Sequence, residues 1–243
     1  MVDKITMVKQ IPIDRFPQNI LIIPDGNGRW AREHGKNVTV GHRIAAERIR
    51  DILEDLKTID QIETITLWAF SSDNWVRDKK EIRGIMMILE YMITRLEKRL
   101  IEEETRFIHI GRKDRIPQRL LNVITLVEEH TKSFNGKILS LAIDFGGEDQ
   151  LVRIMNRSRT LGRDIAIDES TFHNFKDGGS LIPSSDLIIR TSGERRISDI
   201  GWFNGKGTEL YFEPKYFPDV KTDDILDAIL DFSKRERRMG GRG

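Results

Sequence analysis

The chain has 243 residues, contains no cysteine, and sets 40 Lys and Arg against 39 Asp and Glu, for a formal charge of +1. A chain of this length can bury the core of one large domain. The absence of cysteine excludes disulfides, thiol catalysis and Cys-ligated zinc, and the balanced charge gives no general attraction to nucleic acid. Because no signal peptide or run of roughly 18 apolar residues is present, we expect a soluble, cytoplasmic protein.

Short apolar runs alternate along the chain with segments of helical period. The runs predict six strands, at 19–23, 64–70, 106–110, 138–143, 186–189 and 208–212. Most are continuously apolar, which is typical of parallel strands covered on both faces. Apolar residues recur with helical spacing over about 45–56, 82–100, 116–127 and 222–237. The pattern predicts one α/β domain with a central, mostly parallel six-stranded sheet flanked by helices. Residues 1–17 form an extension, and 162–185 is the loosest segment.

Polar segments follow four of the predicted strands, and in open parallel sheets ligands bind beyond the carboxyl ends of the strands. In chain order the segments read PDGNGR, SSDNWVR, DFGG and RTSGERRIS. Since these ends meet at one edge of the sheet, we expect the four segments to converge on one site.

The first segment, in the sequence IPDGNGRWAREHG at 23–35, allows three interpretations. Asp-Gly and Asn-Gly favour a hairpin turn, but a helical stretch ending at Gly35 follows instead of a strand. Gly26-x-Gly28-x-x-Ala31 fits a dinucleotide fingerprint, but the next strand ends without the required acid. A strand-to-helix turn that binds phosphate remains. Asp25 beside a phosphate requires a cation between them, for which Mg²⁺ is the usual choice.

Several motifs, taken in order, resemble those of the cis-prenyltransferase family (undecaprenyl diphosphate synthase-like). The similarity covers nearly the whole chain, from Asn19 to Gly240. The matching stretches are Asp25 to Ala31, Gly41-His42, Ala69 to Arg77, Arg190 to Ser198, Glu209 to Phe212 and Arg238-Met239-Gly240. The resemblance implies an Mg²⁺-dependent enzyme that transfers an allylic prenyl group from its diphosphate to isopentenyl diphosphate with cis chain elongation. The final motif implies a homodimer in which the tail reaches the partner's site.

The resemblance also implies roles for individual residues. The residues with implied catalytic roles are Asp25, Ser71 and Asn74. Those implied to bind the donor diphosphate are Gly26, Asn27, Gly28, Arg29, His42 and Arg77. The resemblance implies that the acceptor is bound by Trp75, Arg190, Arg196, Ser198 and Gly240, and the metal by Asp25 and Glu209. A substrate tunnel is expected to be lined by Met86, Leu89, Ile93 and Leu141. Methionines on a helix face are equally well explained as core.

The chain departs from the family pattern at several positions. Val38 stands where a basic residue is usual, and Asp199 to Gly207 and Asp144 to Glu148 replace family motifs near the acceptor side. The new carboxylates suggest altered acceptor use: short products, non-head-to-tail condensation, or transfer to an alcohol with Asp144 or Asp199 as base. Neutral drift in a loop explains the same changes equally well.

Two further alternatives belong to other classes. The chain could be a non-catalytic subunit of a heteromeric prenyltransferase, although Asp25 and the arginines favour a catalytic chain. It could bind nucleic acid through its basic tail, but no second basic stripe accompanies that tail. We expect no nucleic-acid partner, and only transient contact with membranes.

Overall fold

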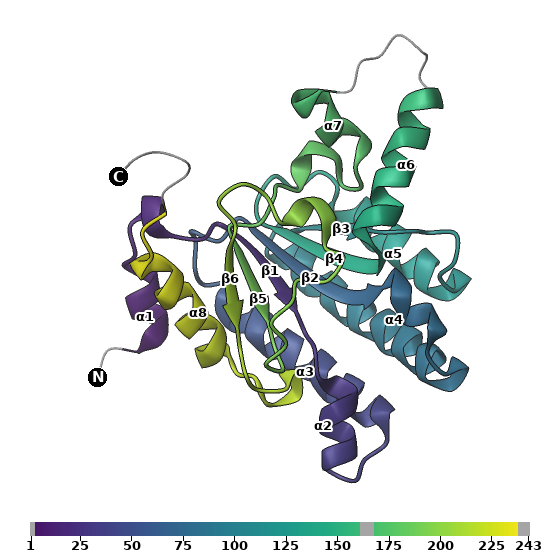
Figure 1. Ribbon diagram of the computed structural model, residues 1–243, viewed down its shortest axis with the longest axis horizontal. Coiled ribbons are helices and arrows are strands. Elements are labelled where there is room, and N and C mark those ends of the chain that lie inside the picture. The colour runs from purple at the N-terminus through teal and green to yellow at the C-terminus, as the bar shows by residue number, and fades with distance from the viewer. Residues whose placement is uncertain (1–2, 161–167, 238–243) are drawn as a thin grey trace.

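The computed structural model describes residues 3–160 and 168–237 and folds them around one six-stranded sheet (Figure 1). The strands are β1 (Asn19–Ile23), β2 (Thr64–Ser71), β3 (Arg106–Ile110), β4 (Ile138–Phe145), β5 (Leu187–Arg190) and β6 (Glu209–Phe212). Their order across the sheet is β3-β4-β2-β1-β5-β6, and every neighbouring pair is parallel. The single α/β domain is confirmed, and the sheet predicted as mostly parallel is entirely parallel.

The described helices are α1 (Lys4–Lys9), α2 (Asn27–Glu33), α3 (Val38–Leu56), α4 (Lys79–Glu102), α5 (Gln118–Thr131), α6 (Gly147–Thr160), α7 (Glu169–Phe175) and α8 (Thr222–Lys234). Five of them, α1, α3, α4, α5 and α8, pack on one face of the sheet, whereas Ile182, Ile200 and Phe203, from outside these helices, cover the other face. Sequence periodicity predicts α3, α4, α5 and α8. It does not predict α6, because Ile154 is the one large apolar side chain that this helix buries. Helix α7 lies in the segment that we expected to be loose.

The strands alternate between two cores, one on each face of the sheet. Ile20 and Ile22 of β1 join the larger core with α3, α4, α5 and α8, whereas Leu21 and Ile23 join the smaller core. The smaller core includes Phe203 from the segment before β6. Burial on both faces explains why the strands read as continuous apolar runs.

The expected substrate tunnel is not shown. All four residues assigned to it are buried in the larger core and at most 6 % exposed: Met86, Leu89, Ile93 and Leu141. Nearby, between α3, α4 and the strands, lies a cavity of about 40 Å³, which has room for little more than a water molecule. In this structure the four side chains act as core.

Side-chain contacts hold the N-terminal segment against the domain and cap the outer edge of β3. The predicted extension contains α1, whose Lys4 Nζ lies 2.6 Å from Asp227 Oδ2 of α8. At the β3 edge, side chains accept from outward N–H groups: Phe107 to Thr131, His109 to Glu128 and, just beyond the strand, Gly111 to Asp177. Capped donors make this edge a poor template for a further strand. Among the described helices, none combines the length and apolarity needed to cross a membrane.

Candidate active site

A cavity of about 500 Å³ opens at the carboxyl ends of β1, β2 and β5. Twelve of the predicted site residues line it: Asp25, Gly26, Asn27, Gly28, Arg29, His42, Ser71, Asn74, Arg77, Arg190, Arg196 and Ser198. Three of the four segments expected to converge, those after β1, β2 and β5, therefore do so, whereas no residue of the DFGG segment at the end of β4 lines the cavity.

The turn after β1 leads directly into α2, so the strand-to-helix interpretation holds and the hairpin does not. Gly26 has a φ of 94°, in the left-handed region. A Cβ at this position would lie 2.5 Å from Tyr216 Cδ1. A glycine is also needed at Gly41 on α3, where a Cβ would lie 2.1 Å from the Asn27 carbonyl oxygen. The two glycines let the turn, α3 and the Tyr216 segment pack closely around the cavity.

Asp25 is held by cations on both sides. Arg190 donates to its Oδ2 at 2.9 Å, Arg29 donates to its Oδ1 at 3.2 Å, and the Gly26 N–H donates to Oδ1 at 2.6 Å. Burial favours the neutral acid, but these hydrogen bonds and the charges of the two arginines outweigh it and hold the pKa of Asp25 below its ordinary value. The carboxylate is therefore ionised at neutral pH.

Arg190, at the end of β5, connects Asp25 to the loop that follows. Its Nη1 donates to the Arg196 carbonyl at 2.6 Å and to Ser198 Oγ at 2.8 Å. The residue is only 5 % exposed, and its Nε is buried without a hydrogen-bond partner. Ser192 and Ser198 in the loop both have positive φ, at 71° and 53°. Such backbone conformations are costly for serine and occur often at ligand sites.

His42 lies between a cation and an anion on the other side of the cavity. Its Nε2 is 3.5 Å from Glu81 Oε1 but makes no hydrogen bond, and Arg77 lies 3.1 Å from the same oxygen. Burial lowers the pKa of His42, and the charge of Arg77 lowers it further, against the opposing effect of Glu81. The imidazole is neutral at neutral pH and has a buried nitrogen available to a ligand.

Ser71 and Asn74 fix the turn that follows β2. Asn74 Oδ1 accepts from the Ser71 backbone N–H at 3.1 Å, and Ser71 Oγ accepts from the Asp73 N–H at 3.2 Å. Both side chains are therefore held in place where they line the cavity.

The sequence reasoning missed Arg32 and Glu194. Arg32 lines the cavity, and its Nη1 is 3.7 Å from the place of a Cβ on Gly28. It lies three residues after Arg29, on the same side of α2, which is the signal that helical spacing offered. Glu194 binds Arg29 at 2.5 Å and also pairs with Arg196. Glu194 thus connects Arg29, predicted to bind the donor diphosphate, with Arg196, predicted to bind the acceptor diphosphate.

Three predicted residues are not placed in the cavity. Trp75 turns away from it and donates to Asp144 at 2.9 Å. Glu209 begins β6, opposite Leu187 at the start of β5, so it lies at the other end of the strand from Arg190. Its carboxylate binds Arg235 at 2.6 Å. The prediction that Glu209 shares a rim with Asp25 is wrong within this chain. Gly240 lies outside the described residues.

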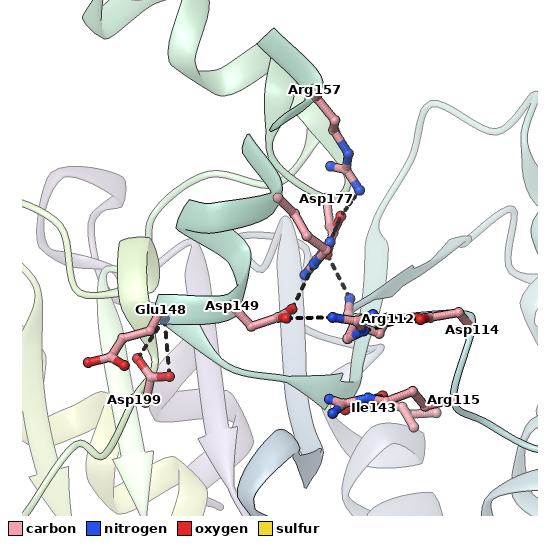
Figure 2. A network of polar contacts seen from close by, with 12 residues as sticks. Arg112, Asp114, Arg115, Ile143, Glu148, Asp149, Arg157, Asp177 and Asp199 are labelled. Carbon is pink, nitrogen blue, oxygen red and sulfur yellow. Dashed lines mark hydrogen bonds and ion pairs between the residues drawn. The ribbon is translucent and has the colours of Figure 1, made fainter. Parts of the chain in front are cut away.

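The proposed bases Asp144 and Asp199 do not line the cavity either. Asp144 is fully buried, with both oxygens bound by Arg115. Asp199 caps the start of α6, where it accepts from the Glu148 N–H at 3.1 Å (Figure 2). Both carboxylates are occupied by structural contacts, which removes them as bases for an acceptor bound in the cavity.

The donor set of the cavity fits Mg²⁺ held jointly with phosphate. Within residues 3–160 and 168–237, no three His, Cys, Asp or Glu side chains gather as a self-sufficient metal cage. Three carboxylates, Asp25, Asp73 and Glu81, instead line the cavity together with five arginines: Arg29, Arg32, Arg77, Arg190 and Arg196. Asp25 is the one among them that two of these arginines bind. Mg²⁺ is commonly bound by one or two carboxylates and the oxygens of a bound phosphate.

Comparisons with known proteins agree with this geometry. Residues 23–240 match the family model described as putative undecaprenyl diphosphate synthase. An isoprenyl transferase of Aquifex aeolicus is 37 % identical over 226 residues, covering 93 % of this chain and 96 % of the relative. Dehydrodolichyl diphosphate synthase 3 of Arabidopsis thaliana is 34 % identical over 241 residues, covering 97 % of this chain and 80 % of the relative.

Solved structures give the same result. Lavandulyl diphosphate synthase from Lavandula x intermedia, in complex with dimethylallyl diphosphate, superposes with a TM-score of 0.87 at 31 % identity. The match covers 93 % of this chain and 99 % of the other. A probable undecaprenyl diphosphate synthase from Campylobacter jejuni gives 0.75 at 24 % identity, covering 92 % and 98 %, which supports the fold alone.

Proposed function

Because this chain belongs to the undecaprenyl diphosphate synthase family of cis-prenyltransferases, we propose that it condenses a short allylic diphosphate with isopentenyl diphosphate in the cavity around Asp25. The chain is an enzyme of the cis-prenyltransferase type, and the proposal concerns its substrates, its metal and its product. The observation that carries it is the position of Arg190, whose guanidinium binds both Asp25 and the Arg196–Ser198 segment. Donor and acceptor residues thereby share one cavity.

The donor diphosphate binds along residues 26–29, with Arg29, His42 and Arg77 around it. His42 offers a buried nitrogen without a partner, and a neighbouring phosphate favours its protonated form. Arg32 supplies the positive charge that Val38 does not, since its guanidinium lies beside Gly28. These groups stabilise the charge that develops on the leaving diphosphate, which is the largest expected contribution to the rate.

The acceptor diphosphate binds at Arg190, Arg196 and Ser198. In the reaction the allylic carbon–oxygen bond breaks, the acceptor double bond supplies the electrons of the new carbon–carbon bond, and one proton passes from the acceptor to an oxygen of the released diphosphate. Ser71 and Asn74 position the reacting ends between the two diphosphates. Mg²⁺, held by Asp25 and the diphosphate oxygens, would neutralise charge on the leaving group.

We propose a short product, because the residues expected to line a tunnel are packed as core. The structure bound to dimethylallyl diphosphate supports a five-carbon donor. A second candidate, condensation without isopentenyl diphosphate, has the same structural support. The two reactions differ in the acceptor, which is isopentenyl diphosphate in the first and a second molecule of the allylic diphosphate in the other.

The enzyme is further proposed to act as a cytoplasmic homodimer. Helix α6 exposes an apolar stripe, with Leu151 at 48 %, Val152 at 52 % and Met155 at 55 %. A second copy is the proposed cover for this stripe. Light scattering on the purified chain should give twice the monomer mass, and Val152→Asp should shift the protein toward monomer. A wild-type monomer would contradict the assignment.

The reaction is tested by mass spectrometry of products formed from dimethylallyl diphosphate, with and without isopentenyl diphosphate and Mg²⁺. We expect short products that contain both substrates and require the metal. Product formed from dimethylallyl diphosphate alone would establish the second candidate. No product under any of these conditions, from a folded chain, would contradict both.

A further inference from the structure

The outer side of α4 carries a surface of mixed apolar and basic character, which we call the α4 face. Its exposed residues are Lys79, Lys80, Arg83, Met87, Tyr91, Thr94, Arg95 and Lys98. Met87 and Tyr91 are each 63 % exposed, and Val76, just before the helix, is 92 % exposed. None of the exposed residues between 79 and 98 is acidic, and Glu81, Glu90 and Glu97 are partly buried.

A groove of about 890 Å³ lies beside the α4 face, between α4 and α5. The two helices pack along each other (Figure 1). Apolar and aromatic side chains form most of its wall: Trp75, Ile82, Met86, Met87, Tyr91, Pro117 and Leu120. Basic side chains stand at its edges, namely Lys79, Arg83 and Arg119.

The acids of α4 in this region are already engaged. Each lies within ion-pair distance of a base: Glu81 with Arg77 at 3.1 Å, Glu90 with Arg119 at 3.7 Å and Glu97 with His130 at 2.7 Å. The nearby Asp78 carboxylate caps the helix, accepting from the Lys80 N–H at 2.8 Å. Lys79, Lys80 and Arg83 have no ion-pair partner among the described residues, so the α4 face has uncompensated positive charge beside exposed apolar groups.

We propose that the α4 face docks the protein on the surface of an anionic lipid bilayer. Apolar side chains enter the headgroup region while lysine and arginine contact anionic lipid, the pattern by which a helix lies in an interface. Tyr91 suits that depth: its hydroxyl accepts from Arg95 Nε at 3.1 Å, leaving an apolar ring beside a charged headgroup contact. Met87, Tyr91 and the arginines would also suit a protein interface, but a second protein copy fits less well because three lysines, Lys79, Lys80 and Lys98, share the face and lysine is depleted in such interfaces.

Docking in this orientation brings the cavity close to the lipid. The same segment of η2 (Ser72–Val76) and α4 contributes Asn74, Arg77 and Ile85 to the cavity and Trp75, Ile82 and Met86 to the groove. The proposal does not depend on the reaction, since it follows from charge and exposure alone. Combined with a prenyl product, it gives a lipid a short path from the cavity to the bilayer.

The test is flotation of the purified chain with vesicles of phosphatidylcholine containing phosphatidylglycerol, and with vesicles of phosphatidylcholine alone. The wild type should float with the anionic vesicles, and less so as salt rises. Arg83→Glu should lower vesicle affinity roughly 25-fold, since each basic charge near the surface contributes about five-fold. Met87→Asp should lower it about ten-fold, through lost apolar burial.

Matched controls carry the same changes elsewhere. Arg50→Glu alters an exposed arginine of α3, and Ile13→Asp alters an apolar side chain that is 55 % exposed; both should float like the wild type. Equal losses in these controls, equal wild-type binding to neutral vesicles, or no wild-type flotation would overturn the proposal. Conversion of a dimer to a monomer by Met87→Asp would show instead that a second copy covers this face. Turnover measured without vesicles should be unchanged in both test variants, and a chain without turnover still gives a valid flotation result.

Discussion

Two regions at the carboxyl ends of the strands combine arginines with carboxylates, and they differ in how exposed the carboxylates are and in what the arginines bind. In the cavity beside β1, β2 and β5, Asp25 is 29 % exposed and its arginine neighbours surround about 500 Å³ of open space. Beside β3 and β4, Asp144 is fully buried, and Asp149 and Asp177 bind arginines from α6 and from the loop after β3 (Figure 2).

The difference shows that composition alone does not make an anion site. In the second region the arginines connect loops to α6: Arg112 binds Asp114 and Asp149, near the start of the helix, and Arg157, in its last turn, binds Asp177. In the cavity, Arg32 has no ion-pair partner among the described residues, and His42 Nε2 and Arg190 Nε are buried without hydrogen bonds. The second region also borders open space, a hollow of about 810 Å³ lined by Arg112, Arg153 and Arg157, and Arg153 Nη2 is buried there without a hydrogen bond. All three of these arginines bind carboxylates. Because Arg32 binds none among the described residues, the cavity around Asp25 keeps positive charge available for an anion.

The largest effect is expected for Asp25→Asn, which removes the one ionised carboxylate joined to both Arg29 and Arg190. Turnover should fall about 10³-fold, or roughly 4 kcal/mol of transition-state stabilisation. The melting temperature should change little, because Asn keeps the shape of the side chain. Steady-state kinetics and calorimetry measure both quantities. Substantial remaining turnover would show that Asp25 belongs with the structural carboxylates.

Asp144→Asn should give the opposite result. Neutralising a fully buried carboxylate bound by Arg115 and Trp75 should lower the free energy of unfolding by about 3 kcal/mol. The molecules that remain folded at low temperature should turn over substrate at nearly the wild-type rate. Urea denaturation together with the kinetic assay checks this. Loss of activity without loss of stability would place Asp144 in the catalytic machinery.

Lys176, beside the structural network, gives a pH-dependent effect. It is 3 % exposed, lies 3.7 Å from the centre of the Trp202 ring, and burial lowers its pKa to about 8 from 10.5. Between these values the unfolded chain binds the extra proton, so stability should rise with pH from about 8 to 10.5. Lys176→Met should therefore be more stable than wild type by about 2 kcal/mol at pH 7. That advantage should shrink above pH 8, and a constant difference across the range would contradict the shifted pKa.

The smallest effect is expected for Arg32→Ala, which tests whether this residue replaces the basic group absent at Val38. The KM for the allylic diphosphate should rise about ten-fold with little change in kcat, corresponding to about 1.4 kcal/mol of lost ground-state and transition-state binding. Lys36→Ala, which alters an exposed base outside the cavity lining, is the control. Equal effects in the two variants would show only a general loss of positive charge.

The sequence predicts the strands closely, because burial on both faces makes each one a continuous apolar run. Strands β1 and β3 have the predicted bounds, and the segments after β1, β2 and β5 do meet. Helix α6 escapes prediction, since its apolar residues Leu151, Val152 and Met155 face outward. Glu209 is near the start of the strand predicted at 208–212, and in the parallel sheet this puts it at the opposite end from Arg190. The assignment of Glu209 to the site came from the family motif and not from the direction of the strand.

Other parts of the site depend on side-chain directions that spacing does not determine. Asp25 and Asp144 both come just after the apolar run of a predicted strand, yet the Asp144 side chain makes a buried contact with Trp75 and the Asp25 side chain faces the cavity. The pairing of Glu194 with Arg29 joins residues 165 positions apart, and no local pattern indicates it.

The central claim is that donor and acceptor diphosphates bind together in the cavity around Asp25. A crystal structure with Mg²⁺, isopentenyl diphosphate and a non-reactive thiolo analogue of dimethylallyl diphosphate tests it most directly. We predict the allylic diphosphate on residues 26–29 with Arg29 and His42, and the second diphosphate on Arg190, Arg196 and Ser198. Diphosphates bound instead among the arginines beside β3 and β4, or a single diphosphate spanning both predicted positions, would contradict the account.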